Sequence, residues 1–358
     1  MKRIFYFLMI CLFTIMISEG QACSVFGLKG ETYCIAGKNF DWAVDDGLLV
    51  FNKRHVKKTA FVYYNQNVKS SAAWTSKYGS VTFNQYGVGL PATGMNEKGL
   101  VVDASVLLTG KFSSPDDRPS INPNQWVEYQ LDNFATTEEV ISHVEDIRIR
   151  PKNPNYPGIH YFIWDKNGNY AVVDLDEGGA VVSRGNASTI PVMTNSEYSF
   201  SLNSWKEKKI PEKDMGTSIA RFISAADQIS SASPATSQEA RDFTLNVLDS
   251  LCHKTPTMWQ IVYDPLLSRV YFRTREKKGL KHVDLKHIDF QCHRPMLVLN
   301  INETGQGDVA HKITPYHRDI NRDLIKNALL KTPFIKKAPE QVLDHRSMYP
   351  ETYQCMEE

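Results

Sequence analysis

The stretch CSVFGLKGETYCIAGKNFDW, residues 23–42, decides the fold that we expect for this 358-residue chain. It holds two short runs of β-type residues, 24–28 and 32–36, on either side of Lys29-Gly30-Glu31. Two such runs joined by a short glycine-containing segment are typical of a β-hairpin. The hairpin would place Cys23 at the start of its first strand.

The residues before Cys23 have the pattern of a secretory signal peptide. Lys2 and Arg3 precede an apolar run over residues 4–17, and a small-x-small site follows at residues 20–22. The apolar run is short for a membrane span. We therefore expect residues 1–22 to be removed, the protein to be periplasmic or secreted, and no stable membrane anchor. The alternative is a lipoprotein site, at which Cys23 carries a lipid.

Signal cleavage would leave an odd number of cysteines. Cys11 departs with the signal, and five cysteines remain: Cys23, Cys34, Cys252, Cys292 and Cys355. In an oxidising compartment at least one of these thiols cannot pair within the chain. The same cleavage makes Cys23 the first residue, so both inferences direct attention to its sulfur.

An N-terminal cysteine combines a nucleophile and a base in one residue. Its α-amine titrates near ~7.7–8.0 and its thiol near ~8.5, so either group can accept the other's proton close to neutral pH. Such a residue further requires a positioned carboxylate, a cation near the sulfur and hydrogen-bond donors for an oxyanion. By itself, however, a cysteine after a signal peptide is more often lipidated or half of a disulfide.

The rest of the chain predicts strands, then helices, then strands again. This order favours an α+β fold with sheets inside and helices outside. The expected strands cover 99–108, 158–164, 170–175, 258–263 and 269–273, and the expected helices cover 126–133, 138–146, 217–229 and 237–251. From about residue 302 the chain turns polar, with one amphipathic helix over 321–330. We expect a catalytic domain over 23–300 and a C-terminal extension over 301–358.

Composition and spacing argue against two kinds of partner. The 41 basic and 40 acidic residues nearly balance and form no basic stripe, so we expect no nucleic acid. Cys252-His253 and Cys292-His293 lack the spacing of zinc sites, because adjacent residues on a strand point apart. We expect no metal there, and a disulfide or two buried thiols instead.

Several ordered motifs resemble the choloylglycine hydrolase family, which groups bile salt hydrolases with penicillin V acylases. The resemblance spans roughly residues 23–300. Its motifs are Cys23-Ser24, Gly37-Lys38-Asn39-Phe40-Asp41-Trp42, Gly94-Met95-Asn96-Glu97-Lys98-Gly99-Leu100, Val192-Met193-Thr194-Asn195, Ser218-Ile219-Ala220-Arg221-Phe222, Thr257-Met258-Trp259, Val262-Tyr263-Asp264 and Val270-Tyr271-Phe272-Arg273-Thr274. The resemblance implies a four-layer αββα N-terminal nucleophile hydrolase that needs no cofactor.

The resemblance also implies roles for individual residues. Cys23 would be the nucleophile and its own amine the base, and Asp41 would hold the resulting ammonium. Asn195 would donate its side-chain amide to the oxyanion, and Arg221 would lie beside the sulfur. Three of these residues also have structural alternatives: Asp41 as a turn aspartate, Asn195 as a loop cap and Arg221 as a solvated helix arginine.

Two positions depart from the family pattern. Bile salt hydrolases have arginine where this chain has Lys38, which keeps the charge and loses the planar fork; a solvated structural lysine is the alternative. The second oxyanion donor falls on asparagine or tyrosine in the family and on Val106 here. If the donor is the backbone N–H, valine supplies it equally well; if the side chain shapes specificity, this site differs from both bile salt hydrolases and penicillin V acylases.

The resemblance implies a small-molecule substrate, in which an amide joins a bulky apolar acyl group to a small amine or amino acid. The sequence does not choose among bile salts, penicillin V, acyl-homoserine lactones and other N-acyl amino acids. Nor does it give the oligomeric state, although relatives are often tetramers. Two rivals stay open: a secreted or lipid-anchored binding protein on the same fold, and an aminopeptidase or acyl-lactone amidase with the same machinery.

Overall fold

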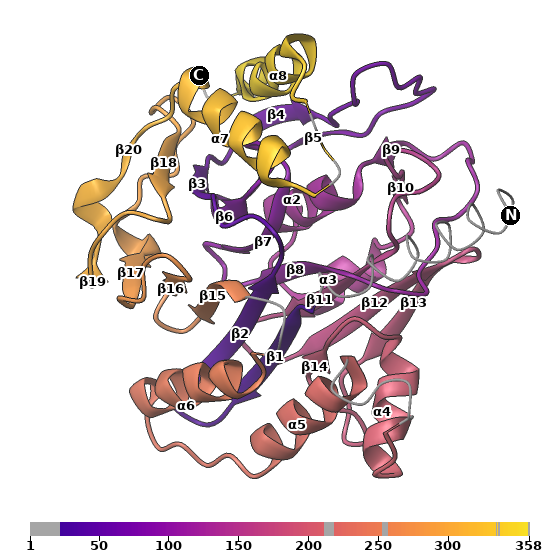
Figure 1. The fold of residues 1–358 in the computed structure, drawn as a ribbon, viewed down its shortest axis with the longest axis vertical. Coiled ribbons are helices and arrows are strands. Elements are labelled where there is room, and N and C mark those ends of the chain that lie inside the picture. Colours follow the sequence, from indigo (N-terminus) through magenta and orange to yellow (C-terminus); the bar gives the residue numbers. More distant parts are fainter. Residues whose placement is uncertain (1–21, 211–217, 253–256, 334, 336, 357–358) are drawn as a thin grey trace, which may run out of the picture.

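The computed structural model describes residues 22–210, 218–252, 257–333, 335 and 337–356 (Figure 1). The signal peptide expected over residues 1–22 therefore lies almost wholly outside the described residues. Within the described part, no helix has the length and apolar character needed to cross a membrane.

Two large sheets form the centre of the molecule (Figure 1). The first has seven strands in the order β14 (Val192–Met193), β1 (Ser24–Lys29), β2 (Cys34–Asp41), β15 (Thr257–Asp264), β16 (Arg269–Thr274), β17 (Lys281–Asp284) and β19 (Gly307–Asp308). The second has nine, in the order β13 (Gly179–Arg184), β12 (Tyr170–Asp176), β11 (Ile159–Trp164), β8 (Val101–Val106), β7 (Pro91–Asn96), β6 (Ser80–Asn84), β3 (Leu48–Asn52), β18 (Leu297–Asn300) and β20 (Thr314–Pro315).

The expected first hairpin is the antiparallel pair β1–β2. Its register places Ser24 opposite Asn39 and Lys29 opposite Cys34, so the start of β1 lies beside the end of β2. Gly27 allows the second sheet to approach β1 closely, because a Cβ atom there would lie only 2.3 Å from the Trp164 ring. This register brings Cys23 and Asp41 together despite their separation in sequence.

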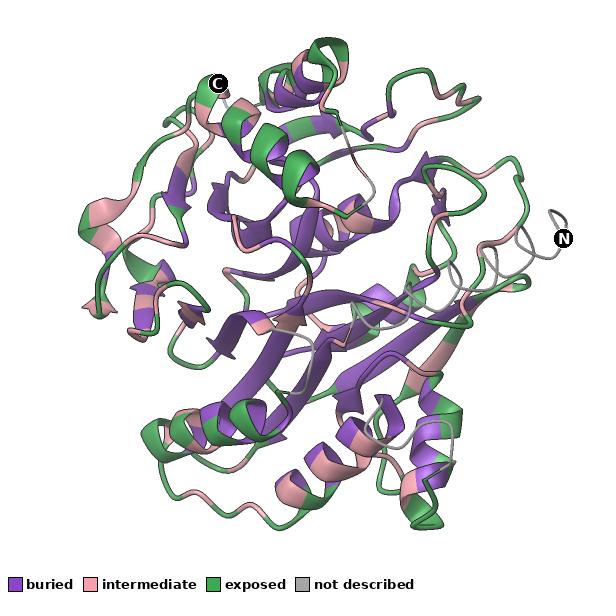
Figure 2. Ribbon diagram, viewed as in Figure 1, coloured by how far each residue is buried: buried purple, intermediate pink, exposed green. Residues whose placement is uncertain are grey.

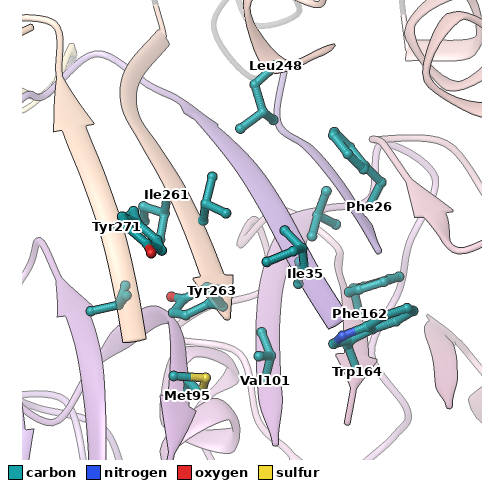
Figure 3. Close-up of a cluster of buried hydrophobic side chains, with 14 of the residues drawn as sticks. Phe26, Ile35, Met95, Val101, Phe162, Trp164, Leu248, Ile261, Tyr263 and Tyr271 are labelled. Carbon is teal, nitrogen blue, oxygen red and sulfur yellow. The ribbon is translucent and has the colours of Figure 1, made fainter. Parts of the chain in front are cut away.

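The principal core fills the space between the two sheets (Figure 3). Ile35 and Tyr263 from the seven-stranded sheet meet Met95, Val101 and Trp164 from the nine-stranded sheet, and all five side chains are at most 1% exposed. A fully buried aliphatic or aromatic side chain contributes about 1.5–3 kcal/mol relative to an exposed one. This apolar layer therefore fixes how the sheets stack.

Helices cover the two outer faces and complete four layers in the order αββα (Figure 2). On the seven-stranded sheet lie α5 (Ser218–Ser230) and α6 (Ser237–Ser250), with α4 (Tyr198–Lys206) packed on α5. On the nine-stranded sheet lie α2 (Pro123–Asn133) and α3 (Thr137–Ser142). Helix α5 buries Ile219, Phe222, Ala226 and Ile229, whose spacing gives one apolar stripe. The expected α+β sandwich is confirmed.

The chain beyond residue 300 joins both sheets. Strand β19 extends the seven-stranded sheet and β20 extends the nine-stranded one. The expected helix over 321–330 is α7 (Arg318–Lys331), which packs against α8 (Glu340–Ser347). A disulfide joins Cys292 to Cys355. The C-terminal segment is thus continuous with the sandwich and tied back to it covalently.

Two small sheets flank the sandwich. One comprises β21 (Gln354–Cys355), β4 (Val56–Thr59) and β5 (Ala73–Thr75), and the other is the parallel pair β9 (Ser120–Ile121) and β10 (Arg148–Ile149). The expected helix over 138–146 ends at Ser142 instead, because the chain turns through residues 143–147 to reach β10. Most short edge strands carry no period-2 pattern long enough to predict them.

Candidate active site

Cys23 lies at the start of β1 and is almost enclosed, with 7% of the residue exposed. Its Sγ lies 3.8 Å from the backbone oxygen of Asp41, at the end of the neighbouring strand. Burial raises the pKa of the Cys23 thiol, whereas the positive charge of Lys38 lowers it. The thiol therefore sits in a dry position where nearby charges decide how readily it ionises.

Arg221 anchors the backbone beside the sulfur. It projects from α5, is 3% exposed, and donates to the carbonyl oxygen of Cys23 at 2.6 Å and to Ser24 Oγ at 2.7 Å. Its other terminal nitrogen donates to Asn195 Oδ1 at 3.0 Å. Burial lowers the pKa of Arg221, while Asp41 and Cys23 oppose this effect. The alternative of a solvated helix arginine is wrong.

Asn195 is held from three sides and is fully buried. Its N–H donates to Ser218 Oγ at 2.8 Å, and its carbonyl accepts from the Leu108 N–H at 3.0 Å. Its Nδ2 donates to the Val106 carbonyl at 2.8 Å. An amide nitrogen carries two hydrogens, so one hydrogen orients the side chain and the other can serve a ligand.

The Val106 backbone faces the same side as Asn195. In β8, Leu107 donates to Gly158 on the β11 side, so hydrogen bonding to β11 falls on alternate residues and the Val106 groups point away from it. The Val106 carbonyl accordingly accepts from Asn195. Pairing with β7 extends only to Asp103, so the N–H of Val106 faces the region of Asn195 beyond the end of that strand.

Lys38 crosses the sandwich and pairs with a residue that the sequence analysis did not single out. Its Nζ lies 2.5 Å from Asp103 Oδ2, and both side chains are 1% exposed. The ammonium also donates to the Ala104 carbonyl at 3.2 Å, and Ser105 Oγ donates to the other oxygen of Asp103 at 3.0 Å. The alternative of a solvated lysine is therefore wrong.

Asp41 is buried and hydrogen-bonded to a second unforeseen residue. Thr257 Oγ1 donates to Asp41 Oδ1 at 2.5 Å and lies 3.2 Å from the sulfur of Cys252. Burial raises the pKa of Asp41 to about 6, although Thr257, Arg221 and Lys38 all lower it. The carboxyl group can therefore change charge within the range of ordinary working pH.

Six sequence-predicted residues thus meet at one place: Cys23, Lys38, Asp41, Val106, Asn195 and Arg221. Asp103, Thr257 and Ser218, which hold three of them in position, were not among the residues predicted for the site. Each nevertheless carried a signal in the sequence: Asp103 interrupts an apolar strand, and Thr257 and Ser218 each begin a family motif.

The remaining cysteines divide into a pair and two thiols. Cys292 is bonded to Cys355, whereas Cys252 is an exposed free thiol and Cys34 a buried one. The expected disulfide is thus confirmed for Cys292, whereas the alternative of two buried thiols is wrong, because Cys252 is exposed. Among the described residues, no three side chains of His, Cys, Asp or Glu are grouped to hold a metal ion, and His253 lies outside them.

The four layers, with Cys23 opening the first strand between the two sheets, define an N-terminal nucleophile hydrolase fold. Residues 23–230 match the linear amide C-N hydrolases, choloylglycine hydrolase family. The chain belongs to this family and is therefore a hydrolase of linear amide C–N bonds.

Individual relatives agree with this assignment. A penicillin V acylase of Pectobacterium atrosepticum is 25% identical over 305 residues, which cover 72% of this chain and 78% of that protein. The structure of a penicillin V acylase from Agrobacterium tumefaciens superposes with a TM-score of 0.71 at 21% identity, covering 82% of this chain and 98% of the other. A mutant conjugated bile acid hydrolase from Clostridium perfringens gives 0.59 at 16% identity, covering 82% and 96%.

Proposed function

We propose that this protein is exported, that cleavage before Cys23 frees its α-amine, and that Cys23 then hydrolyses an amide as an N-terminal nucleophile. One observation carries the proposal: the groups such a residue needs converge on it from separate elements. These groups are the Arg221 guanidinium, the Asn195 amide that it bonds to, the Val106 N–H on the same side, and the buried Asp41 carboxyl, whose charge raises the pKa of the Cys23 thiol. The signal-like pattern of residues 1–22 supports the proposed cleavage before Cys23.

The first half-reaction forms a thioester. The α-amine accepts the thiol proton, and the sulfur attacks the amide carbonyl carbon. The tetrahedral oxyanion is stabilised by the free Nδ2 hydrogen of Asn195 and by the Val106 N–H. The ammonium, held by Asp41, then donates its proton to the amide nitrogen, the C–N bond breaks and the amine leaves.

The second half-reaction restores the enzyme. The α-amine, now neutral, accepts a proton from water, and the hydroxide attacks the thioester carbonyl. The oxyanion occupies the same pair of donors, the C–S bond breaks, and the thiolate takes back the proton. Arg221 holds the Cys23 carbonyl throughout, so the amine and sulfur keep one relative position.

The substrate proposed is an amide between a bulky apolar acyl group and a small amine or amino acid. Penicillin V acylases and conjugated bile acid hydrolases are among the proteins this chain resembles, and their names describe amides of that form.

The test compares three mature proteins that begin at residue 23 with confirmed masses: wild type, Cys23→Ser and Cys252→Ser. Each is assayed on penicillin V, a glycine-conjugated bile salt and an N-acyl amino acid. We expect Cys23→Ser to lose at least roughly 10³-fold in kcat/KM, as for a lost nucleophile. Cys252→Ser, which also removes a free thiol, should retain most activity. A Cys23→Ser protein within tenfold of wild type would refute the nucleophile.

A second comparison tests the base. Protein that keeps a methionine before Cys23, verified by mass as uncleaved, has an amide nitrogen in place of the α-amine. We expect it to be inactive, because an amide nitrogen does not accept the thiol proton. Turnover at the wild-type rate would place the base elsewhere. The mass of the N-terminus of exported protein further tells a free Cys23 from a lipidated one.

A further inference from the structure

A large cavity lies beyond the end of β8. Its volume is about 1040 Å³, and it is lined mainly by residues from the segments 66–70, 110–118 and 148–156, together with Ser120 and Glu177, with Cys23 outside its lining. Pockets that bind small molecules commonly measure roughly 300–1,000 Å³. Ser120 in β9 and Arg148 in β10 belong to its lining, and Figure 1 shows these two strands beside each other at the side of the molecule. The size is therefore that of a ligand site.

The cavity wall is basic. Six basic and three acidic residues line it. The acidic ones already have cationic partners on the exposed rim: Lys69 with Asp117, Lys111 with Glu177 and Arg118 with Asp116. Three basic side chains, those of Arg148, Arg150 and Lys152, are thus left in excess of the carboxylates. A wall of this charge favours an anionic ligand.

Two of these cations are buried at the cavity. Arg148 and Arg150 are two residues apart around β10 and so point to one side, while Ile149 between them belongs to the apolar core. They are 9% and 6% exposed. Among the described residues, the Arg150 guanidinium donates to three neutral groups: Ser120 Oγ at 3.2 Å, the Phe61 carbonyl at 3.3 Å and Gln66 Oε1.

Arg148 has still less to compensate its charge. Within the described part of the chain, its buried Nε has no hydrogen-bond partner. The nearby carboxylate, Asp116, lies 3.8 Å away and forms its closer contacts with Arg118. A buried guanidinium whose carboxylate is distant and shared with another arginine is costly unless a further anion compensates its charge. Burial accordingly lowers the pKa of both Arg148 and Arg150.

The cavity is connected to the candidate active site through one short segment. Gly110, in its wall, lies four residues after Val106, so their Cα atoms are at most about 14 Å apart. In between, the Leu108 N–H bonds to the Asn195 carbonyl at 3.0 Å. Phe112 and Tyr156, with ring centroids 6.3 Å apart, add an apolar surface. Gly110 in the cavity wall therefore lies within about 14 Å of the Val106 backbone, a distance that one extended molecule can span.

We propose that this cavity is an anion subsite, in which Arg148 and Arg150 bind a carboxylate, sulfonate or phosphate group. Its source is the substrate: an anionic group several bonds away from the scissile amide. This choice of source rests on the proposed function, whereas the chemistry of the subsite does not. The geometry thus favours amides with a distant negative charge over neutral amides of the same length.

The test uses monoanilides of dicarboxylic acids with six to twelve carbons, each beside its methyl ester, which has the same amide and no charge. Dissociation constants are measured by calorimetry on mature Cys23→Ala protein. We expect the free acid to bind roughly tenfold more tightly than the ester at the best length, the effect of one charged hydrogen-bonded contact. Arg148→Gln should abolish the preference and Arg148→Lys should keep part of it. Lys69→Gln, which removes a rim cation already paired with Asp117, should leave it unchanged.

Benzoate, titrated alone into the same proteins, tells the two sources of the anion apart. If benzoate binds in an Arg148-dependent manner while acids and esters bind equally, a separate anion occupies the subsite and the substrate assignment is overturned. If benzoate does not bind and no chain length shows an Arg148-dependent preference, the whole inference is overturned. Wild-type protein that hydrolyses none of the anilides or the earlier amides would count against the proposed function alone, because benzoate binding is measured independently.

Discussion

Replacing Lys38 with methionine removes one charge from a buried pair that spans the two sheets. Lys38 Nζ lies 2.5 Å from Asp103 Oδ2, and neither side chain is more than 1% exposed. Methionine keeps the length and the apolar stem, so the packing between the sheets is largely preserved. The main change is that the buried Asp103 carboxylate loses the positive charge of Lys38, and solvent does not replace it.

The size of the effect on stability follows from this burial. Breaking a buried ion pair by removing one partner costs about 3–5 kcal/mol, because an uncompensated charge stays behind. At about 2 °C per kcal/mol, which suits a domain of this size, Tm should fall by roughly 6–10 °C. Asp103→Asn should also destabilise, since it leaves the ammonium with only the Ala104 carbonyl and a neutral amide. The double variant Lys38→Met with Asp103→Leu should recover much of the loss.

The effect on the Cys23 thiol separates the two single variants. The charge of Lys38 lowers the pKa of Cys23, and the charge of Asp103 raises it. Lys38→Met should therefore reduce the thiolate fraction and slow alkylation at a given pH, while Asp103→Asn should increase both. Lys38→Arg, which keeps the charge, is the control. If the Lys38–Asp103 pair had a purely structural role, both substitutions would change the alkylation rate of Cys23 in the same direction.

Iodoacetamide labelling across pH 6–10, with the Cys23 peptide quantified by mass spectrometry, supplies the alkylation profile without any substrate. Scanning calorimetry on the same samples supplies Tm. Identical alkylation profiles for wild type, Lys38→Met and Asp103→Asn would refute the electrostatic link to Cys23. A Lys38→Met protein as stable as wild type would refute the buried pair.

Three further outcomes are expected. Asn195→Ala should lower kcat by about 10²–10³-fold with a smaller change in KM, as for one lost oxyanion donor; steady-state kinetics would contradict this if only KM changed. Thr257→Val removes a hydrogen bond that lowers the pKa of Asp41. If ionised Asp41 holds the ammonium, the acid limb of the pH–rate profile should lie at higher pH in Thr257→Val than in wild type, and an unmoved limb counts against that role. Cys292→Ala opens a loop whose ends are 63 residues apart and should lower the free energy of unfolding, measured in urea, by about 4 kcal/mol. A wild-type unfolding midpoint that does not change when reductant is added would argue against the bond to Cys355.

Much of the fold was predictable because its signals are local. The β1–β2 hairpin, α5 and α6 each follow from a side-chain period over about fifteen residues or fewer; both helices formed within a residue or so of the expected bounds, whereas β2 continues past its expected end to Asp41. The short edge strands were not predictable, because two or three residues carry no period. Helix α3 ends before its expected end for a related reason. The chain turns after it to pair with β9 through β10, and a helical pattern within one segment carries no information about such long-range pairing.

The candidate site divides in the same way. The sequence by itself determined which residues could act, because Cys23 follows a signal-like segment and Asp41, Asn195 and Arg221 stand in ordered motifs. Only the tertiary structure decided how they are held: that Lys38 meets Asp103, that Thr257 bonds to Asp41, and that Cys292 pairs with Cys355. These contacts depend on which faces of two sheets meet and in what register. That stacking is set by the apolar layer between the sheets, and the charged residues are brought together as its consequence.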